Sequence, residues 1–274
     1  GLKLSELVLK TQAAMTEKTE EEMFATMERS LQVMKESVQD GLDKDKRSAS
    51  GLTGGDAYKL NEALKAGKNI AGHFFGNAMM KAVAVAQTNA CMGRIVASPT
   101  AGSCGILPSA LLTLQEEKNI SDKDLVMALF TASAVGIVIA TNASVAGAAG
   151  GCQAECGAAS AMAAAAMVEL CGGTPKQCEH ACAIALKNIL GLVCDPVAGL
   201  VEIPCIKRNA GGVGNALVAA ELALAGVESH IPADEVIVAM KKIGDTMSST
   251  LKETAEGGLA VTPTGKKLCE KVFG

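Results

Sequence analysis

The sequence has almost no large aromatic side chains. Among its 274 residues there is no Trp, one Tyr and only five Phe, although 49% of the residues are hydrophobic. Its core must therefore be built from Ala, Gly, Val, Ile, Leu and Met. Because small side chains let helix axes approach closely, this composition favours packed helices. We predict an all-α protein.

Basic residues are also too few, and too scattered, for a nucleic-acid-binding surface. The chain has 25 Lys and Arg against 29 Asp and Glu, a net charge of -4, and no basic stripe. This excludes the electrostatic footprint that nucleic-acid binding needs, so we expect a small ligand and no nucleic acid. The length and apolar content allow a sizeable core. We predict one domain over residues 1–274, with residues 1–47 as an N-terminal helical segment packed on it.

The sequence lacks a convincing membrane span. Residues 125–140 are apolar almost all round, but Ala, Thr, Ser and Gly on several sides are typical of a helix buried in a bundle. The Ala-rich run 158–170 is shorter than the ~20 residues that a span needs, and glycines bound it. The chain also opens on an amphipathic, charged pattern and not on a signal peptide. We expect a cytoplasmic protein without a membrane partner.

Apolar periodicity predicts helices over residues 3–39, 77–96, 109–118, 125–140 and 158–170. A glycine-rich segment, 146–152, separates the last two. It places irregular backbone between two buried helices, where unpaired N–H and C=O groups must find partners. Such interruptions are common ligand sites. The predicted architecture is a bundle of buried apolar helices around a central site formed by broken helices and loops.

Ten cysteines are present, and most are expected to be reduced, buried small hydrophobes, Cys178 and Cys182 among them. Three instead lie at backbone breaks. Cys152 follows two glycines, Cys194 precedes Asp-Pro, and Cys205 follows a proline. Exposed N–H groups at a helix end or turn stabilise a thiolate, which makes these three the best metal candidates. Cys156 lies four residues after Cys152 on the same helix face, so spacing does not decide between those two.

Three segments carry a resemblance. They are residues 98–109 (Ser-Pro-Thr-Ala-Gly-Ser-Cys-Gly-Ile-Leu-Pro-Ser), 150–157 (Gly-Gly-Cys-Gln-Ala-Glu-Cys-Gly) and 194–210 (Cys-Asp-Pro-Val-Ala-Gly-Leu-Val-Glu-Ile-Pro-Cys-Ile-Lys-Arg-Asn-Ala). In this order they resemble the signature blocks of the alpha chain of iron–sulfur L-serine dehydratases, and the likeness covers nearly the whole chain. In that family three cysteines hold a [4Fe–4S] cluster. The cysteines of this sequence that match those three ligands are Cys152, Cys194 and Cys205.

The resemblance implies an L-serine ammonia-lyase that forms pyruvate and ammonia without pyridoxal phosphate. Three cysteine ligands leave one iron open to act as a Lewis acid on the β-hydroxyl, whereas an electron-transfer cluster is closed by four. It also implies that Ser98, Thr100, Gly102 and Ser103 bind the carboxylate of L-serine through hydroxyls and N–H groups. The alternative is that they are ordinary turn and cap residues. The hydroxyl-rich residues 48–55 are either an anion-binding loop or a surface linker.

The base that removes the α-proton is not identified by the sequence. His73 and Lys207 are weak candidates, and His180 and His230 are expected to be structural. Two-chain members of the family have a separate beta chain with histidine-containing blocks that this chain lacks, which implies a beta-chain partner; a homo-oligomer is also compatible. Cys269 lies near the end of the chain without being terminal, and we expect it not to reach the open iron.

Two other functions remain open. One is an L-cysteine desulfidase of the same superfamily, in which the open iron would act on a thiol. The other is a non-catalytic iron–sulfur scaffold or redox sensor. The blocks that begin at Ser98 and Cys194 favour serine.

Overall fold

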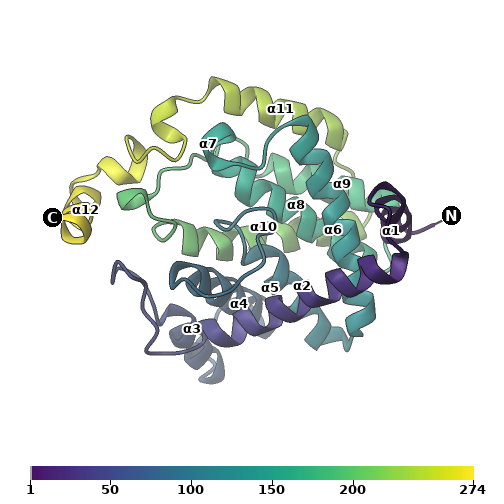
Figure 1. Ribbon diagram of the computed structural model, residues 1–274, viewed down its shortest axis with the longest axis horizontal. Coiled ribbons are helices and arrows are strands. Elements are labelled where there is room, and N and C mark those ends of the chain that lie inside the picture. Colours follow the sequence, from purple (N-terminus) through teal and green to yellow (C-terminus); the bar gives the residue numbers. More distant parts are fainter. Residues whose placement is uncertain (1) are drawn as a thin grey trace.

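The computed structural model describes residues 2–274 and confirms the all-α prediction, with no β-strand among those residues (Figure 1). Its α-helices are α1 (Leu4–Met15), α2 (Glu20–Gly41), α3 (Asp56–Lys65), α4 (Gly72–Ala90), α5 (Ile106–Lys118), α6 (Asp122–Asn142), α7 (Gly147–Gly150), α8 (Ala158–Leu170), α9 (Pro175–Lys187), α10 (Cys205–Leu224), α11 (Ala233–Thr246) and α12 (Pro263–Phe273). Four short segments complete them: the π-helical η1 (Gln153–Gly157) and the 3₁₀ turns η2 (Val197–Gly199), η3 (Ser249–Leu251) and η4 (Gly258–Val261).

The core is centred on α8, which is buried at every residue except its last. Helices α5, α6, α9 and α10 pack around it, as Figure 1 shows for the middle of the molecule. Its alanines let these helices approach closely, and glycines on the neighbours do the same. A Cβ added at Gly136 of α6 would lie 3.0 Å from Sδ of Met162, and one added at Gly212 of α10 would lie 2.3 Å from Cδ1 of Ile106. The composition thus sets the close packing.

The prediction of one helix over residues 3–39 is wrong, because the chain forms two helices there. Glu17 adopts a positive φ of 55° after α1, and α2 starts with a capping box at Thr19. The Thr19 side chain accepts a hydrogen bond from the N–H of Glu22, whose carboxylate accepts one from the N–H of Thr19. Helix α1 then packs on α6, and α2 packs on α4. The hydrophobic pattern continues through the break because both helices bury one face.

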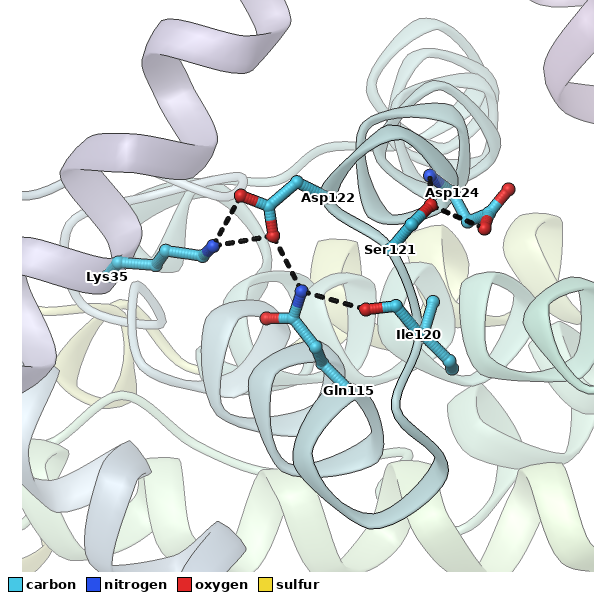
Figure 2. A network of polar contacts seen from close by, with 6 residues as sticks. All are labelled: Lys35, Gln115, Ile120, Ser121, Asp122 and Asp124. Carbon is cyan, nitrogen blue, oxygen red and sulfur yellow. Dashed lines mark hydrogen bonds and ion pairs between the residues drawn. The ribbon is translucent and has the colours of Figure 1, made fainter.

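Three helices meet at Asp122, the first residue of α6 (Figure 2). Lys35 of α2 forms an ion pair with its carboxylate at 2.6 Å, and Nε2 of Gln115 of α5 donates to it at 2.6 Å. The same Gln115 amide donates to the carbonyl of Ile120. Asp122 is more than half exposed, so this ion pair adds little energy. Its effect is to fix how α2, α5 and α6 lie relative to one another.

Helix α6 is long and apolar enough to cross a membrane by length and composition, the one such helix among residues 2–274. Half of its most apolar window is buried inside the protein. It packs on α8, α1 and α2, as a core helix does.

Two interruptions of the bundle lie side by side. One is the sequence of short elements α7 and η1 between α6 and α8, and the other is the loop with η2 between α9 and α10. Helix α10 and η1 are in contact, and α7 packs on α11. π-Helical segments such as η1 occur frequently at functional sites.

Candidate functional site

Two glycines shape the first interruption. Gly151 has a φ of +77°, and a Cβ there would lie 2.7 Å from Sδ of Met247. A Cβ added at Gly147 would lie 2.7 Å from Oε2 of Glu155 and 2.9 Å from Sγ of Cys194. Only glycine fits at either position without a shift of the neighbours. The glycine-rich segment therefore lets the chain close over a packed group of side chains.

That group joins the two interruptions. Cys152, Glu155 and Cys194 are all buried, and their ligand atoms lie within 4.8 Å of one another. Oε2 of Glu155 is 4.0 Å from Sγ of Cys152 and 3.8 Å from Sγ of Cys194. Sγ of Cys156 lies 3.7 Å from Sγ of Cys152. Two of the three predicted metal ligands thus come together from positions 42 residues apart, together with a carboxylate that the sequence analysis missed.

Cys205 is the first residue of α10 and is also buried, but it lies outside the three-residue group. One turn later, Asn209 connects α10 to the segment 98–109. Its Nδ2 donates to the carbonyl of Gly102, and its Oδ1 accepts from the N–H of Gly105, both at 2.8 Å. The three segments that carry the resemblance are therefore connected by direct contacts.

The electrostatics of the group single out Cys152. Hydrogen bonds from the Cys156 and Cys194 thiols lower the pKa of Cys152, and the charge of Arg208 adds to this against the effect of burial. The pKa values of Cys156 and Cys194 are raised, because the interaction with Cys152 favours their protonated forms and because both thiols are buried. Burial raises the pKa of Cys205 to about 12. Cys152 is thus the thiol of the group whose ionisation is favoured, and a thiolate is the form of cysteine that binds metal.

Glu155 is a candidate functional residue that the sequence analysis did not single out. Its Oε1 accepts a hydrogen bond from the hydroxyl of Thr100 at 2.8 Å. Burial and, after it, the negative charge of Cys152 together raise the pKa of Glu155 to about 7. The available signal was its position three residues after Cys152, on the same helix face. A buried carboxylate with a perturbed pKa is a candidate for function.

Three of the four predicted substrate-binding residues, Thr100, Gly102 and Ser103, lie next to this group, and Ser98 begins the same segment. Besides its bond to Glu155, Thr100 shares a hydrogen bond with Ser103, at 3.1 Å between their oxygens. The backbone of Gly102 faces Glu155, since a Cβ there would lie 3.1 Å from Oε1. Ser98 and Ser103 are buried, and the hydroxyl of Ser98 has no hydrogen-bond partner among residues 2–274. A buried hydroxyl without a partner is costly unless a ligand satisfies it.

The two weak candidates for a base lie at the surface. His73 is exposed in the first turn of α4. Lys207 is exposed and forms an ion pair with Asp56 of α3 at 3.2 Å. His180 accepts a hydrogen bond from the N–H of Ser229 at 3.4 Å, and His230 is exposed at a positive φ. Cys269 lies on α12, which packs on η2.

The hydroxyl-rich residues 48–55 use their hydroxyls within the protein. Thr53 donates to Oε2 of Glu202 at 2.5 Å, and Ser50 donates to Oε1 at 2.8 Å. Glu202 is buried three residues before Cys205. The anion that this loop binds is thus a carboxylate of the same chain, and the loop holds the segment that presents Cys205.

A C-terminal segment holds the other side of the site. The N–H of Cys194 donates to the carbonyl of Leu251 at 2.9 Å, and the N–H of Glu253 donates to the carbonyl of Cys194 at 2.8 Å. The N–H of Leu259 donates to Oδ2 of Asp195 at 2.8 Å. Backbone pairing of this kind fixes Cys194 without using its sulfur.

The buried group contains cysteines from two chain breaks and a carboxylate, and it lies inside a helical bundle. These features define a class of protein that can hold a metal or a metal cluster through thiolates. Comparison with known proteins is more specific. The family model for the serine dehydratase alpha chain matches residues 1–260. The chain belongs to this family.

Several named relatives are similar to most of the chain. The probable L-serine dehydratase alpha chain of Bacillus subtilis is 54% identical over 99% of this chain and 90% of its own length. The L-serine dehydratase alpha chain of Peptoniphilus asaccharolyticus is 46% identical over 98% of this chain and 92% of its own. The L-serine dehydratase TdcG of Escherichia coli is 36% identical over 95% of this chain but only 58% of its own length.

Proposed function

We propose that this chain is the catalytic alpha chain of an L-serine dehydratase, a lyase that converts L-serine into pyruvate and ammonia. Its family and the names of its relatives support the reaction. The observation that carries the proposal is the convergence of Cys152 and Cys194 in one buried group with Glu155, to which Thr100 of residues 98–103 donates a hydrogen bond. Thiol ligands and groups able to bind a small anion therefore lie side by side.

Cys152, Cys194 and Cys205 would hold a [4Fe–4S] cluster. The donor set fits this group, because each of the three is buried at a chain break or helix start, where N–H groups stabilise thiolates. Arg208 supplies a nearby positive charge. When bound through three cysteines, such a cluster supplies an open iron that acts as a Lewis acid. Elimination of the β-hydroxyl by this route does not require pyridoxal phosphate.

Ser98, Thr100, Gly102 and Ser103 would bind and orient the carboxylate of L-serine. The partnerless hydroxyl of Ser98 supports this role, since a bound carboxylate would satisfy it. Thr100 also holds Glu155, which fixes the wall of the pocket beside Cys152.

A beta chain would complete the enzyme by supplying the base for the α-proton. Two observations support this. Two relatives that match nearly the whole chain are named alpha chains, while the longer Escherichia coli relative continues well beyond the region that this chain matches. His73 and Lys207, the weak candidates of this chain, are both exposed. We place the enzyme in the cytoplasm, where its ten thiols stay reduced.

Anaerobic reconstitution tests this function. The chain is loaded with iron and sulfide, and release of pyruvate from L-serine and of sulfide from L-cysteine is measured with and without an excess of the candidate beta chain. Pyruvate release that rises strongly on addition of the beta chain is the expected result, since general-base catalysis is worth roughly 10²–10⁴ in rate. Preferential release of sulfide would show a desulfidase, and iron loading without turnover of either substrate would show a redox protein.

A further inference from the structure

We propose that this chain, when it holds no iron–sulfur cluster, binds one Zn²⁺ ion through Cys152, Glu155 and Cys194. This site differs from the proposed cluster site in one ligand. Glu155 takes the place of Cys205, and two cysteines are shared. The inference rests on the geometry of the pocket and not on the reaction of the enzyme.

The distances fit a single ion. Zn²⁺ binds sulfur at about 2.3 Å and carboxylate oxygen at about 2.0–2.2 Å, so tetrahedral ligands lie roughly 3.5–3.8 Å apart. Oε2 of Glu155 is 3.8 Å from Sγ of Cys194 and 4.0 Å from Sγ of Cys152, and all three atoms lie within 4.8 Å of one another. The oxygen would move toward each sulfur by a few tenths of an ångström, and the two sulfurs would approach each other by at most about 1 Å, to close the site. Three protein ligands leave a fourth position for water.

The carboxylate is already oriented as a ligand. Thr100 donates to Oε1 of Glu155, which leaves Oε2 turned toward both sulfurs. A hydrogen bond to the second atom of a ligating group is the usual way in which proteins orient metal ligands. Gly147 contributes by having no side chain, because a Cβ there would occupy the space between Oε2 and Sγ of Cys194.

Charge also favours an ion at this point. Cys152, Glu155 and Cys194 are exposed by 3%, 9% and 2%, so each ionised group would be cut off from water. Buried charges need a partner of opposite sign or a metal. A thiophilic divalent cation meets this need, and two sulfurs with one oxygen suit Zn²⁺ better than Mg²⁺ or Ca²⁺.

Cys205 is a ligand in the proposed cluster site but not in the proposed zinc site. Thiolates that bind three different irons of a four-iron cluster must be spread around it, whereas ligands of one ion converge on a point. Cys205 lies outside the convergent group, although it is buried nearby. The cluster and the single ion would therefore compete for Cys152 and Cys194, with Cys205 needed for the cluster alone and Glu155 for the ion alone.

The test uses the full chain, freed of iron by a chelator and kept reduced and anaerobic. Co²⁺ is titrated as a probe for Zn²⁺, and its tetrahedral ligand-field bands and thiolate charge-transfer band are recorded before displacement by Zn²⁺. We expect one ion per chain with the charge-transfer intensity of two thiolates. An intensity typical of three or four thiolates, or octahedral Co²⁺, would overturn the proposal even if every variant failed to fold.

Three variants sharpen the result. Cys205→Ala should bind Co²⁺ as tightly as the wild type while failing to hold a four-iron cluster. Glu155→Gln should bind Co²⁺ at least tenfold more weakly and still incorporate iron and sulfide. Cys178→Ala should leave Co²⁺ binding unchanged, because Cys178 lies on α9 and is not among the convergent ligands. Loss of Co²⁺ binding in Cys205→Ala or Cys178→Ala, or unchanged binding in Glu155→Gln, would contradict the ligand set.

Competition gives an independent measurement. Zn²⁺ added before reconstitution should reduce iron incorporation into the wild-type chain and have a much smaller effect on Glu155→Gln. Equal inhibition of both would show that Zn²⁺ acts elsewhere. Ion binding and iron content are measured without substrate. The zinc site can therefore be disproved while the dehydratase function holds, and the dehydratase function can be disproved while the zinc site holds.

Discussion

Arg208 and Asp195 form an ion pair inside the protein, with Nη2 of the arginine 2.8 Å from Oδ1 of the aspartate. Their side chains are 17% and 4% exposed. Asp195 follows Cys194 directly and also accepts from the N–H of Leu259, while Arg208 donates to the carbonyl of Val193. The pair thus fastens the start of α10 to the segment that presents Cys194.

Removing Asp195 should destabilise the protein strongly. Asp195→Ala leaves the Arg208 guanidinium buried without its partner, which costs about 3–5 kcal/mol. The matched control is Lys207→Ala. Lys207 directly precedes Arg208, and its ion pair with Asp56 is exposed and worth about 1 kcal/mol or less. The measurement is the midpoint of urea unfolding. Equal shifts for the two variants would show that the buried pair has no special role.

A methyl group at Gly147 should block the metal site while the fold persists. In Gly147→Ala the new Cβ would collide with Glu155 and Cys194, so iron bound after reconstitution should fall well below that of the wild type with little change in helix content. Gly211→Ala is the control, because Gly211 is exposed on α10 and a Cβ there has no neighbour within 4 Å. It should gain about 1 kcal/mol from helix propensity. Normal iron content in Gly147→Ala would refute this account of the pocket.

Loss of the Thr100 hydroxyl should weaken the use of L-serine. A hydrogen bond to a charged group is worth roughly 1.5–3 kcal/mol, so Thr100→Val should lower kcat/KM by on the order of tenfold or more. Thr100→Ser keeps the hydroxyl and should retain most of the activity. Iron content is measured in both variants to separate substrate binding from loading. A kcat/KM that does not change in Thr100→Val would remove Thr100 from the site.

The pH dependence of stability should reveal the buried lysine of α4. Lys81 is almost fully buried and pairs with Glu116 at 2.5 Å. Burial lowers the pKa of Lys81 below its ordinary value of 10.5, and the hydrogen bond to Glu116 opposes this. Between the lowered pKa and 10.5 the unfolded chain binds more protons than the folded one. Stability contributed by this residue therefore rises with pH across that window.

The measurement compares Lys81→Met with the wild type by urea unfolding from neutral pH to about pH 10, the upper end lying below the ordinary lysine pKa of about 10.4. At neutral pH the variant should be as stable as the wild type or more so, since it no longer buries a charge. As the pH rises, the free energy of unfolding of the wild type should increase relative to that of Lys81→Met. Lys65→Met, which removes a charge from an exposed ion pair, corrects for the change in net charge. A difference that is constant with pH would contradict the prediction.

Much of the fold could be predicted from the sequence where one periodicity is uninterrupted. The helix predicted over 158–170 is α8, and the one predicted over 125–140 is α6 without its ends. The break between α1 and α2 was missed because apolar spacing continues through it, although Thr19 and Glu22 form a recognisable capping box. The helix predicted over 77–96 runs over 72–90 instead. Met92 at a positive φ follows its end, and no periodic signal marks such a residue.

The candidate site was predictable only as far as local breaks reveal it. Cys152 and Cys194 were selected because glycine or proline lies beside them, and the structure brings both into one pocket. Glu155 was not selected, because its importance comes from Thr100 and Cys194, which are distant in sequence. The role of residues 48–55 was likewise undecided, since Glu202 lies about 150 residues away. Contacts between remote segments are what a single sequence does not show.

The pairing of Cys194 with Leu251 and Glu253 has a consequence for how the protein matures in the cell. A chain made from its N-terminus exposes Cys152 about a hundred residues before Glu253 leaves the ribosome. Contacts over such separations form late, because long loops must close first. The thiols are therefore fully enclosed only after the residues up to Glu253 have been translated. Delivery of a metal or cluster has to follow synthesis, and a nascent chain presents the thiols separately to oxidants and to competing ions.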